Sequence, residues 1–195
     1  MADALTELRE AVTHCNQCGL AQKRTHVIFG EGSFNAGIMI VGEAPGRDED
    51  IVGRPFVGKS GQLLDKILAA CGFTREKHVF ISNIVKCRPP DNRVPTPQEA
   101  TTCLPWLLQQ IELIDPKIIV LLGATALKYL AGPDHRITRE RGIWTHWQHR
   151  LTMPVYHPAA LLRDPTLKRD TWEDFKKIVV AYRQHIDPNH YSAYV

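Results

Sequence analysis

The stretch KIIVLLG, Lys117–Gly123, decides the fold of this 195-residue sequence. Every side chain between the lysine and the glycine is apolar, so a strand formed here presents apolar residues on both of its faces. Strands buried on both faces are typical of parallel sheets that carry helices on either side. The segment is also much shorter than the roughly 18 residues of a membrane helix. It therefore predicts a strand that is buried on both faces of a parallel sheet.

Further strands and helices alternate around this segment. The other predicted strands are Gly37–Gly42, His78–Lys86 and Thr152–His157. The predicted helices are Gly61–Cys71, a helix opened by the capping box Thr96-Pro97-Gln98-Glu99 and bent or restarted at Pro105, and a last helix that begins with Asp170-Thr171-Trp172-Glu173. This alternation predicts a single α/β domain with a central, mainly parallel four-stranded β-sheet flanked by helices. Ligands of such sheets bind beyond the carboxyl ends of the strands.

Composition and charge are those of an ordinary globular protein. The sequence is 44% apolar and 23% charged, and its formal net charge of +3 does not by itself indicate a nucleic-acid partner. Its start, MADALTELREAVTHC, lacks the basic and apolar regions of a signal peptide, so a cytoplasmic location is expected. Basic residues form three clusters, namely Lys86, Arg88 and Arg93; Arg136, Arg139 and Arg141; and Arg163, Lys168 and Arg169. We interpret them as solvated loops unless the fold gathers them on one face.

The segment GRPFVGKS, Gly53–Ser60, has the letters of a phosphate-binding loop, G-x-x-x-x-G-K-[ST]. Such a loop has to run directly from a buried strand into a helix, whose N-terminus supplies N–H donors. Here the preceding strand ends near Gly42, and ten residues with four carboxylates intervene. Pro55 also has no N–H to offer inside the loop. Nucleotide binding is therefore the least favoured function, and the presence of Phe56 in this loop requires another explanation.

Five cysteines occur in a chain whose expected compartment is reducing, which argues against a disulfide framework. Cys71 lies on the apolar stripe of its helix and is predicted to be a core residue. Of the others, Cys15 and Cys18 form a C-x2-C motif, Cys87 follows a strand, and Cys103 lies in the next helix. These four suit reduced structural thiols, a redox pair, a zinc site or a 4Fe–4S cluster, and their spacing does not decide between iron and zinc.

Side chains with complementary chemistry follow three of the predicted strands. Glu43 comes after the first strand, Asn83 closes the second, and His157 follows the last. Phe56 lies in the Gly- and Pro-rich segment between the first two strands and is expected to be exposed. Taken one at a time, these residues would be a turn amide, a core imidazole and a core ring. Together they offer a stacking ring, an amide that donates and accepts, a carboxylate and an imidazole, which is what recognition of a flipped-out base requires.

Four motifs in this order, together with the four cysteines, resemble family 4 uracil-DNA glycosylases. The motifs are GEAPGRDED, GRPFVGKSGQLLD, ISNIVKCRPP and HPAALLRDP, and the resemblance runs from about Thr13 to Arg183. It implies one three-layer α/β/α domain over residues 1–195, with an N-terminal helix and C-x2-C segment at 1–25 and a tail at 187–195. It also implies a monofunctional DNA repair glycosylase that flips uracil out of DNA and hydrolyses its N-glycosidic bond, leaving an abasic site for base excision repair.

The resemblance implies a set of uracil-binding residues. Phe56 is expected to stack on the flipped uracil, and Asn83 to hydrogen-bond its O4 and N3–H edge and so to reject cytosine. His157 is expected to bond O2 and to stabilise the negative charge that develops as the bond breaks. Gly42 and Ala44 complete the uracil site. The segment GRPFVGKS is then a base-stacking loop rather than a phosphate loop.

The resemblance also implies how water and a cofactor are handled. Glu43 is the candidate group that positions or activates the water. Ala44 stands where the best-known uracil-DNA glycosylases carry a catalytic aspartate, a departure expected for family 4. The family ligands of a structural 4Fe–4S cluster match Cys15, Cys18, Cys87 and Cys103. Neither a nucleotide nor a catalytic metal is expected.

The DNA contacts are implied in the same way. Leu161 is expected to wedge into the duplex where the base has left, Arg88 and Arg163 to contact phosphates, and Glu49 to exclude thymine. The stretch after Cys87 is short and has no histidine, so the covalent attachment to DNA seen in one branch of the superfamily is not expected. The expected partner is uracil-containing DNA, single- or double-stranded, bound by a monomer with no membrane contact. The sequence gives no indication for or against contact with a replication clamp. The alternative function is a catalytically inactive, metal-stabilised DNA-binding module.

Overall fold

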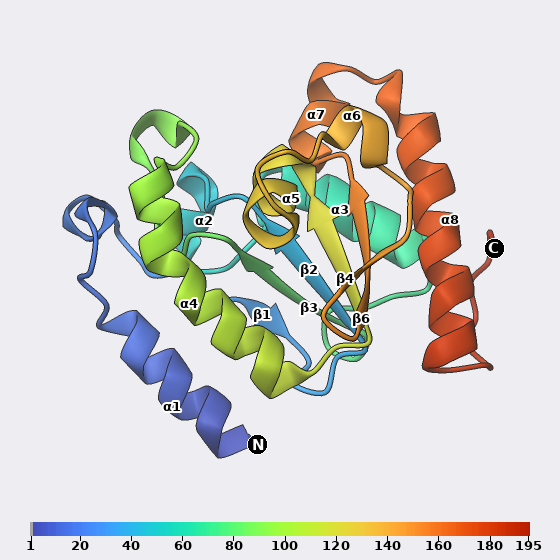
Figure 1. The fold of residues 1–195 in the computed structure, drawn as a ribbon, viewed down its shortest axis with the longest axis horizontal. Coiled ribbons are helices and arrows are strands. Elements are labelled where there is room, and N and C mark those ends of the chain that lie inside the picture. The colour runs from blue at the N-terminus through green and yellow to red at the C-terminus, as the bar shows by residue number, and fades with distance from the viewer. Residues whose placement is uncertain (1) are drawn as a thin grey trace.

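The computed structural model describes residues 2–195, with side chains from residue 4 onward. The strand predicted to be buried on both faces is β4 (Ile118–Leu122), and all five of its residues are buried. It lies between β2 (Ile38–Gly42) and β6 (Arg150–Val155), and β2 pairs in turn with β3 (Val79–Asn83) (Figure 1). All three of these pairings are parallel, which confirms the predicted core of the sheet.

The sheet has six strands rather than the predicted four. β1 (Glu31–Gly32) pairs with β3, and β5 (Thr145–Trp147) pairs with β6, both in the antiparallel direction and at the two edges. Strands of two and three residues are too short to show an alternating pattern, so they leave no signal in the sequence. These two strands cover part of the outer edges of β3 and β6, where unpaired backbone N–H and C=O groups would otherwise be exposed.

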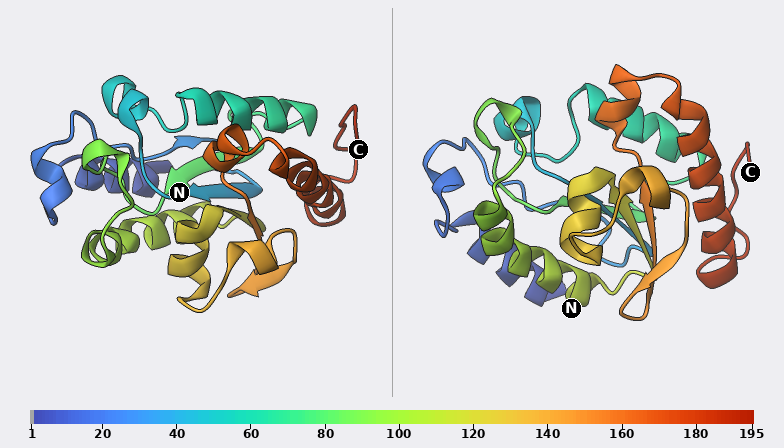
Figure 2. Two further views of the ribbon diagram at one scale, coloured as in Figure 1. Left: turned by 90° about the horizontal axis from the view of Figure 1, so that it is seen from above. Right: turned by 45° about the horizontal axis from the view of Figure 1, so that its top comes forward.

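Helices cover both faces of the sheet (Figure 2). One face carries α1 (Ala2–Thr13), α4 (Pro97–Ile114) and α5 (Gly123–Ala131), and the other carries α3 (Lys59–Ala70), α7 (Pro158–Arg163) and α8 (Leu167–His185). In β4, Ile119 and Leu121 pack in the first core, whereas Ile118 and Val120 pack in the second. The shorter helices are α2 (Arg47–Val52) and α6 (Ile137–Glu140). Among residues 2–195, no helix combines the length and the apolar character needed to cross a membrane.

α4 runs unbroken through Pro105, so it does not restart there. The predicted capping box is present, because the Thr96 hydroxyl accepts from the Glu99 N–H and the Glu99 carboxylate accepts from the Thr96 N–H. A proline deprives a helix of the hydrogen bond to the carbonyl four residues earlier, which here belongs to Thr101. Pro105 and Thr101 are both exposed, so water is able to satisfy this carbonyl and the helix continues.

α8 begins at Leu167, before the predicted start at Asp170. Asp164 holds the turn that leads into it, since its carboxylate accepts hydrogen bonds from the Thr166 N–H (3.0 Å) and hydroxyl (2.6 Å). Asp170 consequently lies within the first turn, where a carboxylate interacts favourably with the helix dipole. The sequence offers two possible helix starts here, and the chain uses the earlier one.

The tail, residues 187–195, packs on the ends of α3 and α8. Ser192 Oγ donates to the Ala70 carbonyl (3.1 Å), and the His190 ring bonds the Cys71 carbonyl (2.9 Å). The Arg183 Nε donates to the His190 carbonyl (2.9 Å). These contacts fix the tail at the C-terminal end of α3, whereas Phe56 lies just before its N-terminal end.

Candidate active site

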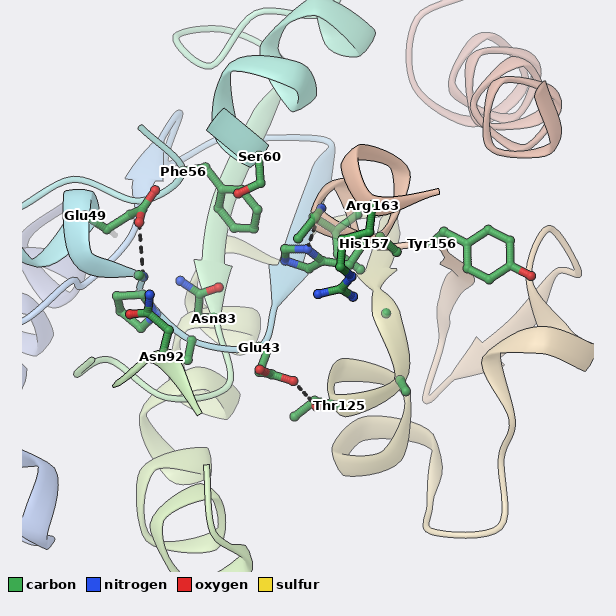
Figure 3. A pocket seen from close by; sticks show the side chains of 18 of the residues that line it. Glu43, Glu49, Phe56, Ser60, Asn83, Asn92, Thr125, Tyr156, His157 and Arg163 are labelled. Atoms are coloured by element: carbon green, nitrogen blue, oxygen red, sulfur yellow. Dashed lines mark hydrogen bonds between the residues drawn. The ribbon is translucent and has the colours of Figure 1, made fainter. Parts of the chain in front are cut away.

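The segments that follow β2, β3, β4 and β6 open into one cavity of about 580 Å³ at the carboxyl edge of the sheet (Figure 3). Its wall includes most of the predicted site residues, namely Glu43, Ala44, Glu49, Phe56, Asn83, His157 and Arg163. Gly42, Arg88 and Leu161 are not part of the wall. Phe56, Asn83 and His157 converge on a common space (Figure 3). The segments that carry them are far apart in sequence, and the parallel sheet brings them together.

Asn83, the last residue of β3, contributes an amide with unused hydrogen-bonding capacity. The residue is 1% exposed, and its Oδ1 atom is buried without a hydrogen-bond partner among the described residues. Its backbone is held in register beside Gly42 and accepts a hydrogen bond from Lys86 Nζ (2.8 Å). An amide carries both an acceptor and two donors, so this side chain is able to bond both a C=O and an N–H of one planar ligand.

Phe56 forms a wall of the cavity, but it is 5% exposed and not exposed as predicted. Its ring centroid lies 5.6 Å from that of His157, with the two rings inclined by 34°. Gly42 explains the close packing, because a Cβ there would lie 2.7 Å from Phe56 Cζ and 2.5 Å from Asn83 Oδ1. Gly42 therefore acts by having no side chain, which lets the ring and the amide approach each other.

His157 is the N-cap of α7, and its Nδ1 accepts a hydrogen bond from the Ala159 N–H (3.1 Å). An acceptor at Nδ1 places the proton of the neutral ring on Nε2, which is thereby a donor. The residue is only part-buried, since one side of it faces the cavity. Burial, and then the positive charge of Arg163, nevertheless lower the pKa of His157 to about 4, against a smaller opposite effect of Glu49. The site thus presents a neutral imidazole at physiological pH.

Glu43 lies on the cavity wall next to Thr125 of α5, whose hydroxyl donates to the Glu43 carboxylate (Figure 3). This contact joins the loop that follows β2 to the first turn of α5, which follows β4 directly. The sequence predicts ligand binding beyond the strand ends but does not point to Thr125, because a lone threonine in a helix has no distinctive pattern. Ala44, beside Glu43, also lies on the wall and offers no polar side chain.

Glu49 braces two loops through backbone contacts. One carboxylate oxygen accepts from the N–H groups of Val57 (2.8 Å) and Gly58 (2.9 Å), and the other accepts from that of Gly46 (3.0 Å). Gly58 is the N-cap of α3, so the helix start that would receive a phosphate is already occupied by a carboxylate of the chain itself. This occupancy is consistent with the prediction that GRPFVGKS is no phosphate loop. The exclusion of thymine by Glu49 stays a prediction.

The basic clusters are not uniformly solvated loops. Lys86 is 1% exposed, and its ammonium group donates to Ser82, Asn83 and Gln110. Arg141 forms ion pairs with Asp170 and Asp174. These cations are used internally and do not form part of a surface for phosphates.

The prediction of which α7 residue wedges into the DNA duplex is wrong. Leu161 is 1% exposed and lies in the protein interior, so it is not available to enter a duplex. The sequence HPAALLR contains a second leucine at the next position, Leu162, which is 45% exposed. Successive residues on a helix face different directions, and a motif alone does not reveal which of two adjacent leucines points outward.

The four predicted ligand cysteines share a second, smaller cavity, whereas Cys71 is fully buried in the core next to β2 and β4, as predicted. The walls of the cavity include Cys15, Cys18, Cys87 and Cys103. No group of three or more His, Cys, Asp or Glu side chains in the described part of the chain has the geometry to hold a metal ion. A change of side-chain rotamer alters the directions of the thiols but not the cavity that they share.

The residues around the cysteine cavity fit an anionic, sulfur-rich group. The Arg24 guanidinium donates to Cys87 Sγ (3.3 Å), and the Lys86 backbone N–H donates to Cys103 Sγ (3.3 Å). Trp106, also on the wall, has a buried indole N–H without a partner among the described residues. Burial raises the pKa of Cys87 to about 11, so this thiol is protonated when nothing is bound to it. Donors directed at sulfur are typical of iron–sulfur sites.

An unpaired amide, an aromatic wall and a neutral imidazole in one cavity beyond a parallel sheet define a pocket that recognises a planar nucleobase, as in DNA glycosylases. The model of the uracil DNA glycosylase superfamily matches residues 29–176. A type-4 uracil-DNA glycosylase of Sulfurisphaera tokodaii is 46% identical, with 90% of this chain and 84% of that protein covered. Its counterpart in Thermotoga maritima is 46% identical, with 86% and 89% covered, and that in Archaeoglobus fulgidus is 40% identical, with 90% and 92% covered. The chain belongs to the uracil-DNA glycosylase superfamily and, within it, to the type-4 family.

Proposed function

We propose that this cavity binds a uracil flipped out of DNA and hydrolyses its N-glycosidic bond, so that the chain is a uracil-DNA glycosylase of base excision repair. One observation carries the proposal, which is that Asn83 Oδ1 is buried in the site without a hydrogen-bond partner. A buried acceptor left unpaired costs about 1–3 kcal/mol, unless a ligand brings a donor to it. The N3–H group of uracil is such a donor, and the adjacent O4 is an acceptor for the amide N–H.

The same amide discriminates against cytosine. Cytosine has no proton on N3 and carries an amino group in place of O4, so both of its groups are mispaired against Asn83. Sites built to hydrogen-bond a substrate reject an analogue with the wrong polar groups by large factors. The ring of Phe56 accepts the face of either pyrimidine and therefore adds affinity without choosing between them.

His157 stabilises the charge that develops on the base. As the N-glycosidic bond breaks, electrons pass into the uracil ring and negative charge accumulates on its oxygens. The Nε2–H of the neutral ring donates to O2, where that charge grows, and the Ala159 N–H keeps the proton on Nε2. A preorganised donor of this kind contributes more in the transition state than in the ground state.

Glu43 holds the water that attacks the sugar. Loss of the base leaves positive charge on the sugar ring, which a carboxylate across the cavity stabilises. The Thr125 hydroxyl fixes the orientation of this carboxylate, while Ala44 beside it contributes no group to the chemistry.

The surroundings of the cavity bind the DNA backbone. Arg163, on the wall, and Arg88, next to the loop that carries Asn92, supply cations for phosphates. Leu162 is the exposed apolar side chain that α7 offers to the space left by the base.

The cysteine cavity holds a 4Fe–4S cluster with Cys15, Cys18, Cys87 and Cys103 as ligands. When bound, the cluster supplies a rigid cross-link between the N-terminal segment, the loop after β3 and α4. Arg24 and the Lys86 backbone N–H orient two of the sulfurs for it. The Asn83 backbone lies three residues before this site and is held by the Lys86 side chain.

The test of this function uses an end-labelled oligonucleotide with a single uracil and purified protein, without added metal or nucleotide. Alkali cuts the strand at any abasic site that the protein leaves. We expect complete cutting at uracil and none when thymine or cytosine occupies that position. Equal cutting at cytosine would contradict the role of Asn83. In a parallel reaction with ATP or GTP added, cutting that appears only there would restore the phosphate-loop interpretation.

The neutral state of His157 predicts a specific dependence of stability on pH. Its folded pKa of about 4 lies below the usual 6.5, so the unfolded chain binds the proton more tightly than the folded one. The stability that follows is fully present above pH 6.5 and is lost as the pH falls from about 6.5 to about 4, by roughly 2–3 kcal/mol. His157→Asn keeps an N-cap acceptor without titrating in this range. Denaturant unfolding should therefore show that this variant loses less free energy of unfolding than the natural protein as the pH falls. Equal losses in the two proteins would contradict the lowered pKa of His157.

The contact between Thr125 and Glu43 predicts a loss of rate rather than of DNA binding. Thr125→Val removes the hydroxyl at constant shape, and we expect kcat to fall by about tenfold, as for one lost hydrogen bond to a charged group. Thr125→Ser keeps the donor and should retain nearly full kcat. Single-turnover excision and the affinity for uracil-free DNA measure both effects. Equal kcat values for the valine and serine variants would show that the hydroxyl does not position Glu43.

A further inference from the structure

Arg75, in the turn between α3 and β3, reaches the backbone of the base-stacking loop. Its Nη1 donates to the Pro55 carbonyl (2.8 Å), and its Nη2 donates to the Phe56 carbonyl (2.7 Å). The same guanidinium bonds Asp65 through Nε (2.9 Å) and Glu31 through Nη1 (3.3 Å). Its side chain is 10% exposed. One part-buried cation thus joins two consecutive loop carbonyls to two carboxylates.

The loop needs such support, because Phe56 adopts a backbone conformation that bulky residues rarely take. Its φ of +53° lies in the left-handed region, which persists in non-glycine residues only where the surroundings enforce it. In this conformation the Phe56 carbonyl packs directly on Gly61, where a Cβ would lie 2.0 Å from the oxygen. The ring in turn lies between Gly42 and His157. A rotation of the Phe56 backbone would move the ring out of this position.

An arginine suits this role better than a lysine would. The guanidinium is planar and presents its N–H donors in a fixed fork, so it is able to hold two carbonyls and two carboxylates at once. Lysine offers the same charge from a single atom on a flexible stem and does not reproduce the fork. The charges of Glu31 and Asp65 neutralise the part-buried guanidinium.

Arg54 offers a natural comparison with Arg75. It pairs with the same carboxylate, Glu31, through two hydrogen bonds of 2.6 and 2.8 Å, but its side chain is 59% exposed. The hydrogen bond from Arg54 is the largest cause that holds the pKa of Glu31 below its usual value. The two arginines therefore share a partner, while the hydrogen bonds to the Pro55 and Phe56 carbonyls come from Arg75.

We propose that Arg75 is a positioning residue for base recognition: it holds the Pro55 and Phe56 carbonyls so that the Phe56 ring stays against the bound uracil. This inference rests on the proposed uracil excision. The turn between α3 and β3 lies outside the cavity, yet through Arg75 it controls the position of the aromatic wall inside the cavity. Arg75 does not line the cavity, so its effect on base recognition passes through the loop that carries Phe56.

The test is a double-mutant cycle between Arg75 and Phe56, measured as kcat/KM for a uracil oligonucleotide. Arg75→Lys in the natural background should lower kcat/KM by about tenfold, as expected from the loss of the hydrogen bonds to the loop. In the Phe56→Leu background, which has no ring to position, the same change should cost less than about twofold. The matched control, Arg54→Lys, should stay within about twofold of the natural protein. A purely structural role for Arg75 would instead give the same loss in both backgrounds, which would overturn the inference.

A binding measurement extends the test to variants whose excision is too slow for kcat/KM to be measured. It compares the affinity for an oligonucleotide with 2′-fluoro-deoxyuridine, which resists cleavage, with that for the same sequence with thymidine. Arg75→Lys should reduce the preference for the uracil oligonucleotide, and the affinity for the thymidine one should stay the same. An unchanged preference would overturn the inference. Absence of excision and of any preference in the unmodified protein would instead refute the proposed function, so the two failures are distinguishable.

Discussion

Replacing Asn83 with Asp is expected to lower uracil excision by at least about a thousandfold, the largest effect of any single substitution in the cavity. A carboxylate has no N–H to donate to O4, and it places a negative charge where the transition state gathers negative charge on the base. It also lies beside the Phe56 ring and Gly42, where there is little room for water to solvate it. The loss should appear in single-turnover excision, which isolates the chemical step from product release.

Asn92 provides the matched control for this substitution. It lines the same cavity, but it is exposed on the loop after Cys87, and its Oδ1 already accepts from Arg88 Nε (2.8 Å). Asn92→Asp should reduce excision by no more than about tenfold, within the range of a single hydrogen bond. Binding of uracil-free DNA should persist in both variants. Rapid excision by Asn83→Asp would contradict the assignment of base recognition to this amide.

Replacing Cys87 with Ala is expected to remove the bound iron and to destabilise the fold by at least about 3 kcal/mol. The cluster would join segments that are far apart in sequence, from the end of α1 to the middle of α4, so its loss releases long stretches of chain. The cavity that remains would hold unpaired donors from Arg24 and Trp106. Iron content, the visible absorption of the cluster and the free energy of unfolding measure these effects.

Cys71→Ala separates loss of a ligand from loss of a buried sulfur. Cys71 is fully buried in the core and outside the cysteine cavity, so its truncation should cost about 1–2 kcal/mol for the lost packing and should leave the iron content unchanged. Equal iron content in Cys87→Ala and Cys71→Ala would contradict the proposed set of four ligand cysteines. Loss of iron from Cys71→Ala alone would contradict it as well.

Much of the fold follows from patterns that the sequence displays openly. The apolar run from Ile118 to Leu122 requires burial on both faces, and the parallel order β3–β2–β4–β6 satisfies it. The edge strands β1 and β5 do not follow from the sequence, because two or three residues show no periodicity and are held by their neighbours instead. The start of α8 was misplaced for a related reason, since two polar turns compete and the packing of the helix decides between them.

The candidate site was predictable in its residue types and less so in its geometry. The positions of Asn83 and His157 at strand ends follow from the topology of a parallel sheet. The burial of Phe56 and of Leu161 does not follow from their motifs, because burial depends on packing against segments that are distant in sequence. The Thr125 hydroxyl and the Arg75 guanidinium also escape sequence reasoning, since each acts on a residue of another loop through a tertiary contact.

The most direct test of the central claim is a mass measurement on both products of one reaction. Purified protein is mixed with an oligonucleotide that carries one uracil, and the strand and the free base are quantified together. We predict that each strand loses one uracil and gains one water, that free uracil appears in equal amount, and that no strand stays attached to protein. An unchanged strand, from protein that carries its full content of iron, would contradict the claim and favour an inactive, metal-stabilised DNA-binding module.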